Sequence, residues 1–328
     1  MKYADKYIDL HRHLDGSVSF AMAKKLAEIQ GTKLPGKNDE ELMRLLSVQE
    51  KNATLDQALK CFALPCSLMQ TKESLSECVR LAMEEAERDG VVYAELRWAP
   101  QLHTDCGMTQ EDAVKAALEG LKRSPIKGNF ILCCMRGVGN EQKNLETIEV
   151  AKKYLVRDGG VVAVDLAGAE NIFPSSDYRE LFKKVKNDGL PFTFHAGEAD
   201  GPSSVWCALE YGADRIGHGY RSKEDPKLLD RLAEIGIPLE MCPTSNKITN
   251  FISDMSSYPL IDFMNRGIKV TLNSDDPYIL HTTLSNEFRV MEKECGLTPE
   301  QEHILLENSI DAAFTDEKGK EEIRKLVF

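Results

Sequence analysis

The sequence lacks the features of a membrane or secreted protein. No stretch approaches the run of about 18 apolar residues that a transmembrane helix needs. The first residues, Met1-Lys2-Tyr3, do not lead into the apolar core of a signal peptide. The nine cysteines are odd in number and form no C-x-x-C pair, which excludes a disulfide framework and a zinc ribbon. These absences favour a cytoplasmic protein with reduced thiols and no membrane partner.

The sequence also has fewer positive than negative side chains. The 328 residues include 41 Lys and Arg against 53 Asp and Glu, which gives a formal net charge of −12. A field of this sign repels phosphate backbones, so we expect a small-molecule substrate and no nucleic-acid partner. Glycine and proline are not pooled into a linker, so residues 1–328 are expected to form one domain. The sequence leaves the oligomeric state open, and a monomer is the simplest expectation.

Short apolar runs alternate with longer amphipathic patterns along the chain. This alternation predicts parallel strands with right-handed helical crossovers, and eight such units predict a (β/α)8 TIM barrel. The expected strands are Tyr7–His11, Val91–Trp98, Phe130–Met135, Val161–Ala167, Phe192–His195, Arg215–His218, Pro238–Met241 and Lys269–Asn273. The expected helices between them include Thr109–Arg123, Glu141–Val156, Ser175–Asn187, Pro226–Ile235 and Leu260–Arg266.

Two irregularities in the spacing predict additions to the barrel. A helical insert, Ser17–Arg88, follows the first strand and is a candidate lid, and extra helices follow the eighth strand. Within the insert, Leu55, Leu59 and Phe62 have helical spacing and would either cover a ligand or pack in the core. An open doubly wound sheet is the alternative fold, but no glycine-rich turn follows the first strand.

Polar residues follow five of the predicted strands. The C-terminal strand ends of such a barrel form the active site, so we expect these residues to meet. Four of the seven histidines belong to this group, whereas His103, His281 and His303 are expected to lie outside it. The segments are His11–Gly16, Asp165–Gly168, His195–Glu198, His218–Gly219 and Asn273–Pro277.

Four of these residues could bind a metal. His11 and His13 are two positions apart, so the alternation of a strand directs both side chains to one face. With His195 and Asp275 they would offer three nitrogens and one oxygen, a set that suits catalytic zinc. The ordinary alternative to a metal site is structural: the histidines would be hydrogen-bonded at the strand ends, and Asp275 would belong to a turn. Val161–Ala167 contains no lysine to bridge two metals, so one zinc ion per chain is expected.

Five motifs in order resemble the adenosine deaminases of the metal-dependent amidohydrolase superfamily. The resemblance implies a zinc-bearing (β/α)8 barrel that hydrolyses adenosine and 2'-deoxyadenosine to inosine and 2'-deoxyinosine, with release of ammonia, in purine salvage. The motifs are H-x-H-L-D-G at His11–Gly16, D-L-A-G at Asp165–Gly168, H-A-G-E at His195–Glu198, I-G-H-G-Y at Ile216–Tyr220 and N-S-D-D-P at Asn273–Pro277.

The resemblance also implies a role for each matched residue. The four donors named above would hold the zinc, and Glu198, His218 and Asp275 would be catalytic. Zinc lowers the pKa of bound water toward about 7, and a protonated Glu198 would donate to the purine ring at N1.

Substrate contacts are implied at four further positions. His13 and Asp15 would lie against the substrate, with Asp15 at the ribose 5'-hydroxyl. The backbone N–H of Gly168 would serve N3, and Asp276 would accept at the N7 side. Ala169 departs from the Asp that often follows this glycine in the family, which puts in doubt any side-chain contact there.

Two alternative functions stay open at this point. The chain could deaminate adenine or another 6-aminopurine derivative, although the short Asp15 suits a ribose hydroxyl. It could instead be a noncatalytic zinc-binding relative, although such a protein has no chemical need for Glu198 and His218.

Overall fold

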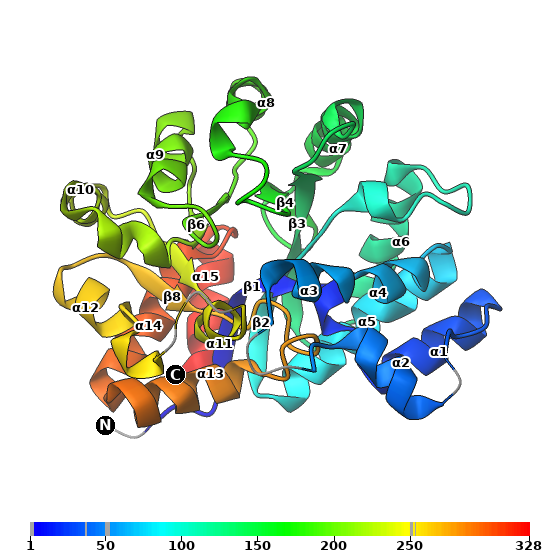
Figure 1. The fold of residues 1–328 in the computed structure, drawn as a ribbon, viewed down its shortest axis with the longest axis horizontal. Helices are drawn as coiled ribbons and strands as arrows, with labels where there is room; N and C mark the ends of the chain where they lie inside the picture. The colour runs from blue at the N-terminus through cyan, green and yellow to red at the C-terminus, as the bar shows by residue number, and fades with distance from the viewer. Residues whose placement is uncertain (1–2, 37, 50–52, 250–251, 253) are drawn as a thin grey trace.

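The computed structural model describes residues 3–36, 38–49, 53–249, 252 and 254–328. Within this part of the chain, parallel strands follow one another in the order β1-β2-β3-β4 and β5-β6-β7-β8 (Figure 1). The strands are β1 Tyr7–His13, β2 Val91–Trp98, β3 Lys127–Met135, β4 Val161–Ala167, β5 His195–Ala196, β6 Ile216–His218, β7 Leu239–Met241 and β8 Val270–Leu272.

Two seams connect the two groups of four strands. At one seam, Val164 of β4 pairs with Phe192 just before β5 in an isolated parallel bridge. At the other, the His13 N–H donates to the Asp275 carbonyl and the Asp275 N–H donates to the His11 carbonyl, both at 2.8 Å. The ladder is interrupted at these seams, but the strand order is that of the expected (β/α)8 barrel. A doubly wound sheet is excluded, because its strand order reverses at a switch point.

Helices in the connections surround the strands (Figure 1). The predicted helix after β2 begins at a capping box, in which the Thr109 hydroxyl accepts from the Asp112 N–H. The predicted barrel requires helices after β5 and β7, but the sequence analysis gave no ranges for these two, α9 and α11. The helices between strands are α5 Lys72–Arg88, α6 Gln110–Leu121, α7 Glu141–Tyr154, α8 Arg179–Asn187, α9 Pro202–Tyr211, α10 Pro226–Ile235, α11 Pro243–Ile248 and α12 Leu260–Asn265. Single turns lie at η1 Asp15–Ser17, η2 Pro100–Leu102, η3 Ser175–Tyr178, η4 Tyr220–Glu224, η5 Met255–Ser257 and η6 Met291–Cys295.

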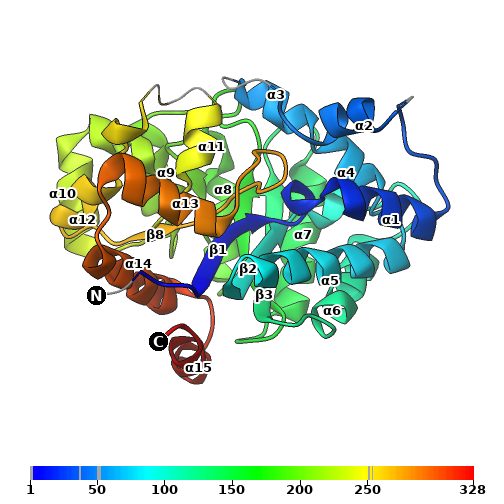
Figure 2. The ribbon, with the colours of Figure 1, turned by 90° about the horizontal axis from the view of Figure 1, so that it is seen from below.

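The additions lie at opposite ends of the barrel. The insert contains α1 Phe20–Gln30, α2 Asp39–Leu46, α3 Leu55–Lys60 and α4 Ala63–Ser67, and the tail contains α13 Leu284–Val290, α14 Pro299–Ala312 and α15 Glu317–Val327. Figure 2 shows α3 and α11 at one end and α15 at the other. Ile310 and Ile323 of the tail pack against Ile8 and Leu10 of β1, so the tail covers the N-terminal strand ends.

One helix of the insert, α5, does not belong to a lid. Helix α5 packs against α6 and β2, so it is the barrel helix of the first unit. None of the helices among the described residues is long and apolar enough to cross a membrane.

Candidate metal centre and active site

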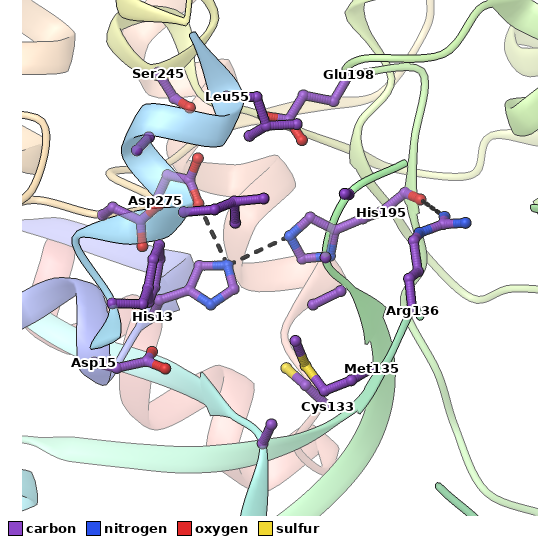
Figure 3. A pocket seen from close by; sticks show the side chains of 18 of the residues that line it. His13, Asp15, Leu55, Cys133, Met135, Arg136, His195, Glu198, Ser245 and Asp275 are labelled. Atoms are coloured by element: carbon purple, nitrogen blue, oxygen red, sulfur yellow. Dashed lines mark hydrogen bonds and ion pairs between the residues drawn. The ribbon is translucent and has the colours of Figure 1, made fainter. Parts of the chain in front are cut away.

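The four expected metal donors meet at the C-terminal ends of β1, β5 and β8. The Nε2 atom of His13 lies 3.3 Å from Nε2 of His195 and 3.4 Å from Oδ1 of Asp275 (Figure 3). The Nε2 atom of His11 lies 3.3 Å from the same oxygen. Four ligands about 2.0–2.1 Å from one ion in tetrahedral geometry would be about 3.3–3.4 Å apart. The spacing of these donors therefore fits a single metal ion.

The surroundings of the donors also fit a metal. All four side chains are buried, and Nε2 of His11 has no hydrogen-bond partner. Buried polar atoms normally have a partner, so this orphaned nitrogen is what an ion at this point would satisfy. Burial also holds the pKa of His13 well below its usual value, which keeps its imidazole neutral as a ligand must be.

Carboxylates hold two of these histidines from behind. Nδ1 of His11 lies 2.8 Å from Oε2 of Glu240, and Nδ1 of His195 lies 2.8 Å from Oδ2 of Asp165. Arg97 links the two carboxylates, at 2.7 Å from Glu240 and 3.1 Å from Asp165. A carboxylate at Nδ1 keeps the proton there and directs the Nε2 lone pair into the site.

The sequence analysis missed Arg97 and Glu240 and gave Asp165 no role of its own. A signal was available, because these are charged residues within strands whose neighbours are apolar, and charged residues are rarely buried unless they are paired. Both Arg97 and Glu240 are fully buried.

Glu198 lies beside the metal donors on the loop after β5. Its side chain is buried, and burial together with the charges of Asp275 and Glu170 raises its pKa well above the usual value. His218, at the end of β6, has Nε2 3.7 Å from Oε2 of Glu198 and 3.9 Å from Oδ2 of Asp275. The carboxyl group of Glu198, the imidazole of His218 and the candidate metal donor Asp275 thus face the same space.

His218 and Asp275 share an uncommon backbone conformation. Their φ angles are +60° and +61°, in the left-handed region. Such a conformation costs a non-glycine residue on the order of 1–3 kcal/mol and persists only where the surrounding structure imposes it. At Asp275 the backbone hydrogen bonds to His11 and His13 fix this conformation. The side chains of His218 and Asp275 both face the site, with Nε2 of His218 3.9 Å from Oδ2 of Asp275.

Two residues behind His218 hold its ring. Nδ2 of Asn246, on α11, lies 3.4 Å from Nδ1 of His218, and the Tyr258 hydroxyl donates to Oδ1 of Asn246 at 3.0 Å. This arrangement leaves Nε2 of His218 facing the reactive groups. The sequence analysis assigned neither Asn246 nor Tyr258 a role.

A cavity of about 330 Å³ opens above these groups. His13, Glu198 and Asp275 line it, together with Leu55 and Phe62 of the insert. The size is that of a small-ligand site. The sequence left open whether Leu55, Leu59 and Phe62 cover a ligand or pack in the core. Because all three line the cavity, the structure supports the first alternative.

Known proteins are similar to this chain in sequence and in fold. The family model for adenosine deaminase matches residues 7–328. An adenosine deaminase from Haemophilus ducreyi is 46% identical over 319 residues, covering 95% of this chain and 93% of the relative. The chain belongs to the adenosine deaminase family. It is therefore a hydrolytic deaminase of the amidohydrolase superfamily.

Solved structures of related deaminases have the same fold. An adenine deaminase from Arthrobacter aurescens superimposes with a TM-score of 0.87 at 26% identity, covering 97% of both chains. The N6-methyl-AMP deaminase from Arabidopsis thaliana has a TM-score of 0.82 at 26% identity, covering 98% of this chain and 95% of the other.

The expected substrate-contact residues of this deaminase also line the cavity. Oδ1 of Asp15 and Oδ1 of Asp276 are buried without a hydrogen-bond partner. Burial raises the pKa of Asp15 to about 6, and burial with the charges of Asp275 and Asp15 raises that of Asp276 well above its usual value. Gly168 has a φ of +111°, a conformation that favours glycine.

The remaining histidines of the deaminase lie outside the cavity lining. His103 is buried behind Trp98, His281 contacts the Val48 carbonyl at 2.9 Å, and His303 is on α14. The expectation that these three take no part in the site is consistent with their positions.

Proposed function

We propose that this chain deaminates adenosine and 2'-deoxyadenosine to inosine and 2'-deoxyinosine, with release of ammonia. The observation that carries the proposal is the convergence of four metal donors and a buried Glu198 on one nucleoside-sized cavity. Family membership supports the reaction type. All nine cysteines are free thiols, which supports a role in the cytoplasm, where thiols stay reduced.

The proposed metal ligands are His11, His13, His195 and Asp275. Three imidazole nitrogens with one carboxylate oxygen favour one zinc ion. Such an ion supplies activation of water, whose pKa it lowers toward about 7.

Glu198 is the proposed acid of the reaction. Addition of water at C6 of the purine moves an electron pair onto N1, which then needs a proton. A carboxyl group whose pKa is raised by burial keeps its proton near neutral pH and donates it there. As the C6–N6 bond breaks, one proton of the added water passes to the amino group, which leaves as ammonia, and the other returns Glu198 to its protonated form.

His218 is proposed to orient the attacking water. Its Nε2 faces both Glu198 and Asp275, while Asn246 keeps the ring from turning. Near a divalent ion, an imidazole held in this way also stabilises charge that develops as the water is added.

Four residues of the cavity are proposed to contact the substrate. The unpartnered Oδ1 of Asp15 accepts from the ribose 5'-hydroxyl. Gly168 offers its backbone N–H to N3, and His13 borders the reacting ring. The sequence-based role of Asp276 as an acceptor needs correction, because N7 of adenine has a lone pair and no hydrogen. Asp276 therefore binds N7 as a protonated carboxyl that donates.

The decisive experiment follows the loss of ultraviolet absorbance when purified protein is mixed with adenosine. Turnover should disappear with a chelator and return with zinc. Adenine and N6-methyl-AMP serve as competing substrates, and faster turnover of either would replace adenosine as the substrate. A protein that binds zinc but deaminates none of the three would be the noncatalytic relative.

A further inference from the structure

A second glutamate, Glu170, supports the loop that carries Glu198. Glu170 follows β4 and is only 1% exposed. Its carboxylate accepts four consecutive backbone N–H groups of the loop after β5. The donors are Gly197 (2.7 Å, to Oε1), Glu198 (3.0 Å, to Oε2), Ala199 (2.7 Å, to Oε2) and Asp200 (2.9 Å, to Oε2).

The loop has the form of an anion-binding nest. Successive backbone N–H groups around a left-handed residue create a concave site for an anion, and Gly197 has a φ of +68°. A Cβ added at Gly197 would also lie 2.7 Å from the Val205 side chain, so only glycine fits. The anion in this nest is the Glu170 carboxylate, supplied by the neighbouring loop.

A chain of polar side chains extends the support to both ends of the segment. The Ser204 hydroxyl donates to Oε1 of Glu170, and Oγ of Ser175 lies 2.6 Å from Oγ of Ser204. Arg136 donates to Ser175 at 3.1 Å and to the His195 carbonyl at 2.7 Å (Figure 3). The loop is thereby held at the metal-binding histidine and at the proposed acid.

We propose that Glu170 is a positioning residue that sets the place of the Glu198 carboxyl in the deamination reaction, and this rests on the proposed function. Glu170 is not among the described residues that line the cavity, so it acts through the loop rather than on the substrate. Without it, four buried N–H groups would lose their acceptor, and the loop would rearrange to recover partners. Its charge also helps to keep Glu198 protonated.

The direct test is the Glu170→Gln variant. An amide of the same size offers one oxygen and two N–H donors, so it cannot accept four N–H groups. We expect kcat to fall about 10- to 100-fold, the loss typical of small misplacement of a reacting group, while KM and zinc content stay unchanged. Hydrogen exchange at the amides of 197–200 should become faster. Unchanged kcat or unchanged exchange would overturn the proposal.

A matched control separates positioning from general destabilisation. Glu302 is also a buried carboxyl group that accepts a backbone N–H, from Ala4 at 3.1 Å, and it lies outside the cavity. Glu302→Gln should leave kcat unchanged, whatever its effect on thermal stability. An equal kcat loss in this control would assign the effect of Glu170→Gln to the fold in general.

A double variant tests whether Glu170 acts through Glu198. If it does, Glu170→Gln should have little further effect on kcat once Glu198→Gln is present, because the proton donor is already gone. Full additivity of the two losses would overturn the proposal.

If Glu170→Gln does not fold, the Ser204→Ala variant tests the same proposal. It removes one donor to the same carboxylate, and we expect a smaller kcat loss with unchanged KM; wild-type kcat would overturn the proposal. Failure of the proposed function looks different, because the wild-type protein itself would then not deaminate adenosine.

Discussion

At the scale of single residues, the chemistry of the site comes from what surrounds each side chain. Glu198 is an ordinary carboxyl whose pKa is raised well above its usual value by burial and by two neighbouring acidic groups, Asp275 and Glu170. His11 and His195 are ordinary imidazoles whose orientation is set by Glu240 and Asp165. Each proposed role therefore depends on a residue that does not itself react, and each can be tested by changing one atom.

Glu198→Gln should retain zinc and lose about 10²–10⁴ of kcat, the usual contribution of a general acid. The amide has nearly the same shape as the protonated carboxyl but cannot transfer a proton to N1. Zinc stoichiometry and steady-state kinetics on adenosine are the measurements, with Glu302→Gln as the control. Turnover near that of the wild type would remove Glu198 from the mechanism.

Asp165→Asn should weaken zinc binding about 10- to 100-fold, because an amide holds Nδ1 of His195 less firmly than a carboxylate does. The zinc dissociation constant from competition with a chelator is the readout, and it does not depend on activity. Asp311→Asn, at a position whose side chain is 57% exposed, is the control. Equal zinc affinity in the two variants would show that Asp165 does not position the ligand.

At the scale of elements, short turns rather than long helices bring the proposed substrate-contact residues together. The turn η1 follows β1 directly, and the Gly16 carbonyl accepts from the Tyr278 N–H at 3.0 Å. This contact sets Asp15 and Asp276 against one cavity although they are far apart in sequence. A Cβ added at Gly16 would collide with Oδ1 of Asp276 and lie 2.9 Å from its Cα.

Gly16→Ala should therefore displace Asp276 and lower kcat/KM for adenosine by up to about 10²-fold, the loss that a shift of 1 Å can produce. Zinc content should stay near that of the wild type. Gly201→Ala is the control, because an added Cβ there meets nothing closer than 3.9 Å. If Gly16→Ala and Gly201→Ala have equal kinetics, the close packing of Gly16 against Asp276 does not matter for function.

At the scale of the whole molecule, buried carboxyl groups make stability depend on pH. Burial raises the pKa of Glu287 to about 7, from about 4.5 for an exposed glutamate. Between these values the folded protein binds more protons than the unfolded chain, so its stability falls as pH rises. This contribution is present at pH 5 and is lost by pH 8.

Glu287→Gln should flatten this part of the pH profile. Relative to the wild type, the variant should gain roughly 2 to 3 kcal/mol in the free energy of unfolding between pH 5 and pH 8. Urea unfolding at the two pH values measures the change, with the exposed Glu234→Gln as the control for loss of one charge. Parallel profiles for wild type and Glu287→Gln would contradict the expected ionisation.

Local patterns in the sequence were enough to predict the barrel and the meeting of its strand ends. The runs Val91–Trp98 and Val161–Ala167 coincide with β2 and β4, because apolar strands bounded by polar turns are a local signal. The donors of the candidate metal centre were predictable for the same reason. Each lies in the last part of a strand or just after it, and parallel strands in a barrel bring their C-terminal ends to one rim.

Only the tertiary structure decided how those donors are held. Glu240 contacts His11 across 229 positions of the chain, and Glu170 reaches a loop 27 to 30 residues away. Such contacts depend on the register of strands and on side-chain placement in a shared interior, which no local pattern encodes. The sequence by itself therefore determined which groups reach the site, and the packing of distant segments determined their orientation and protonation.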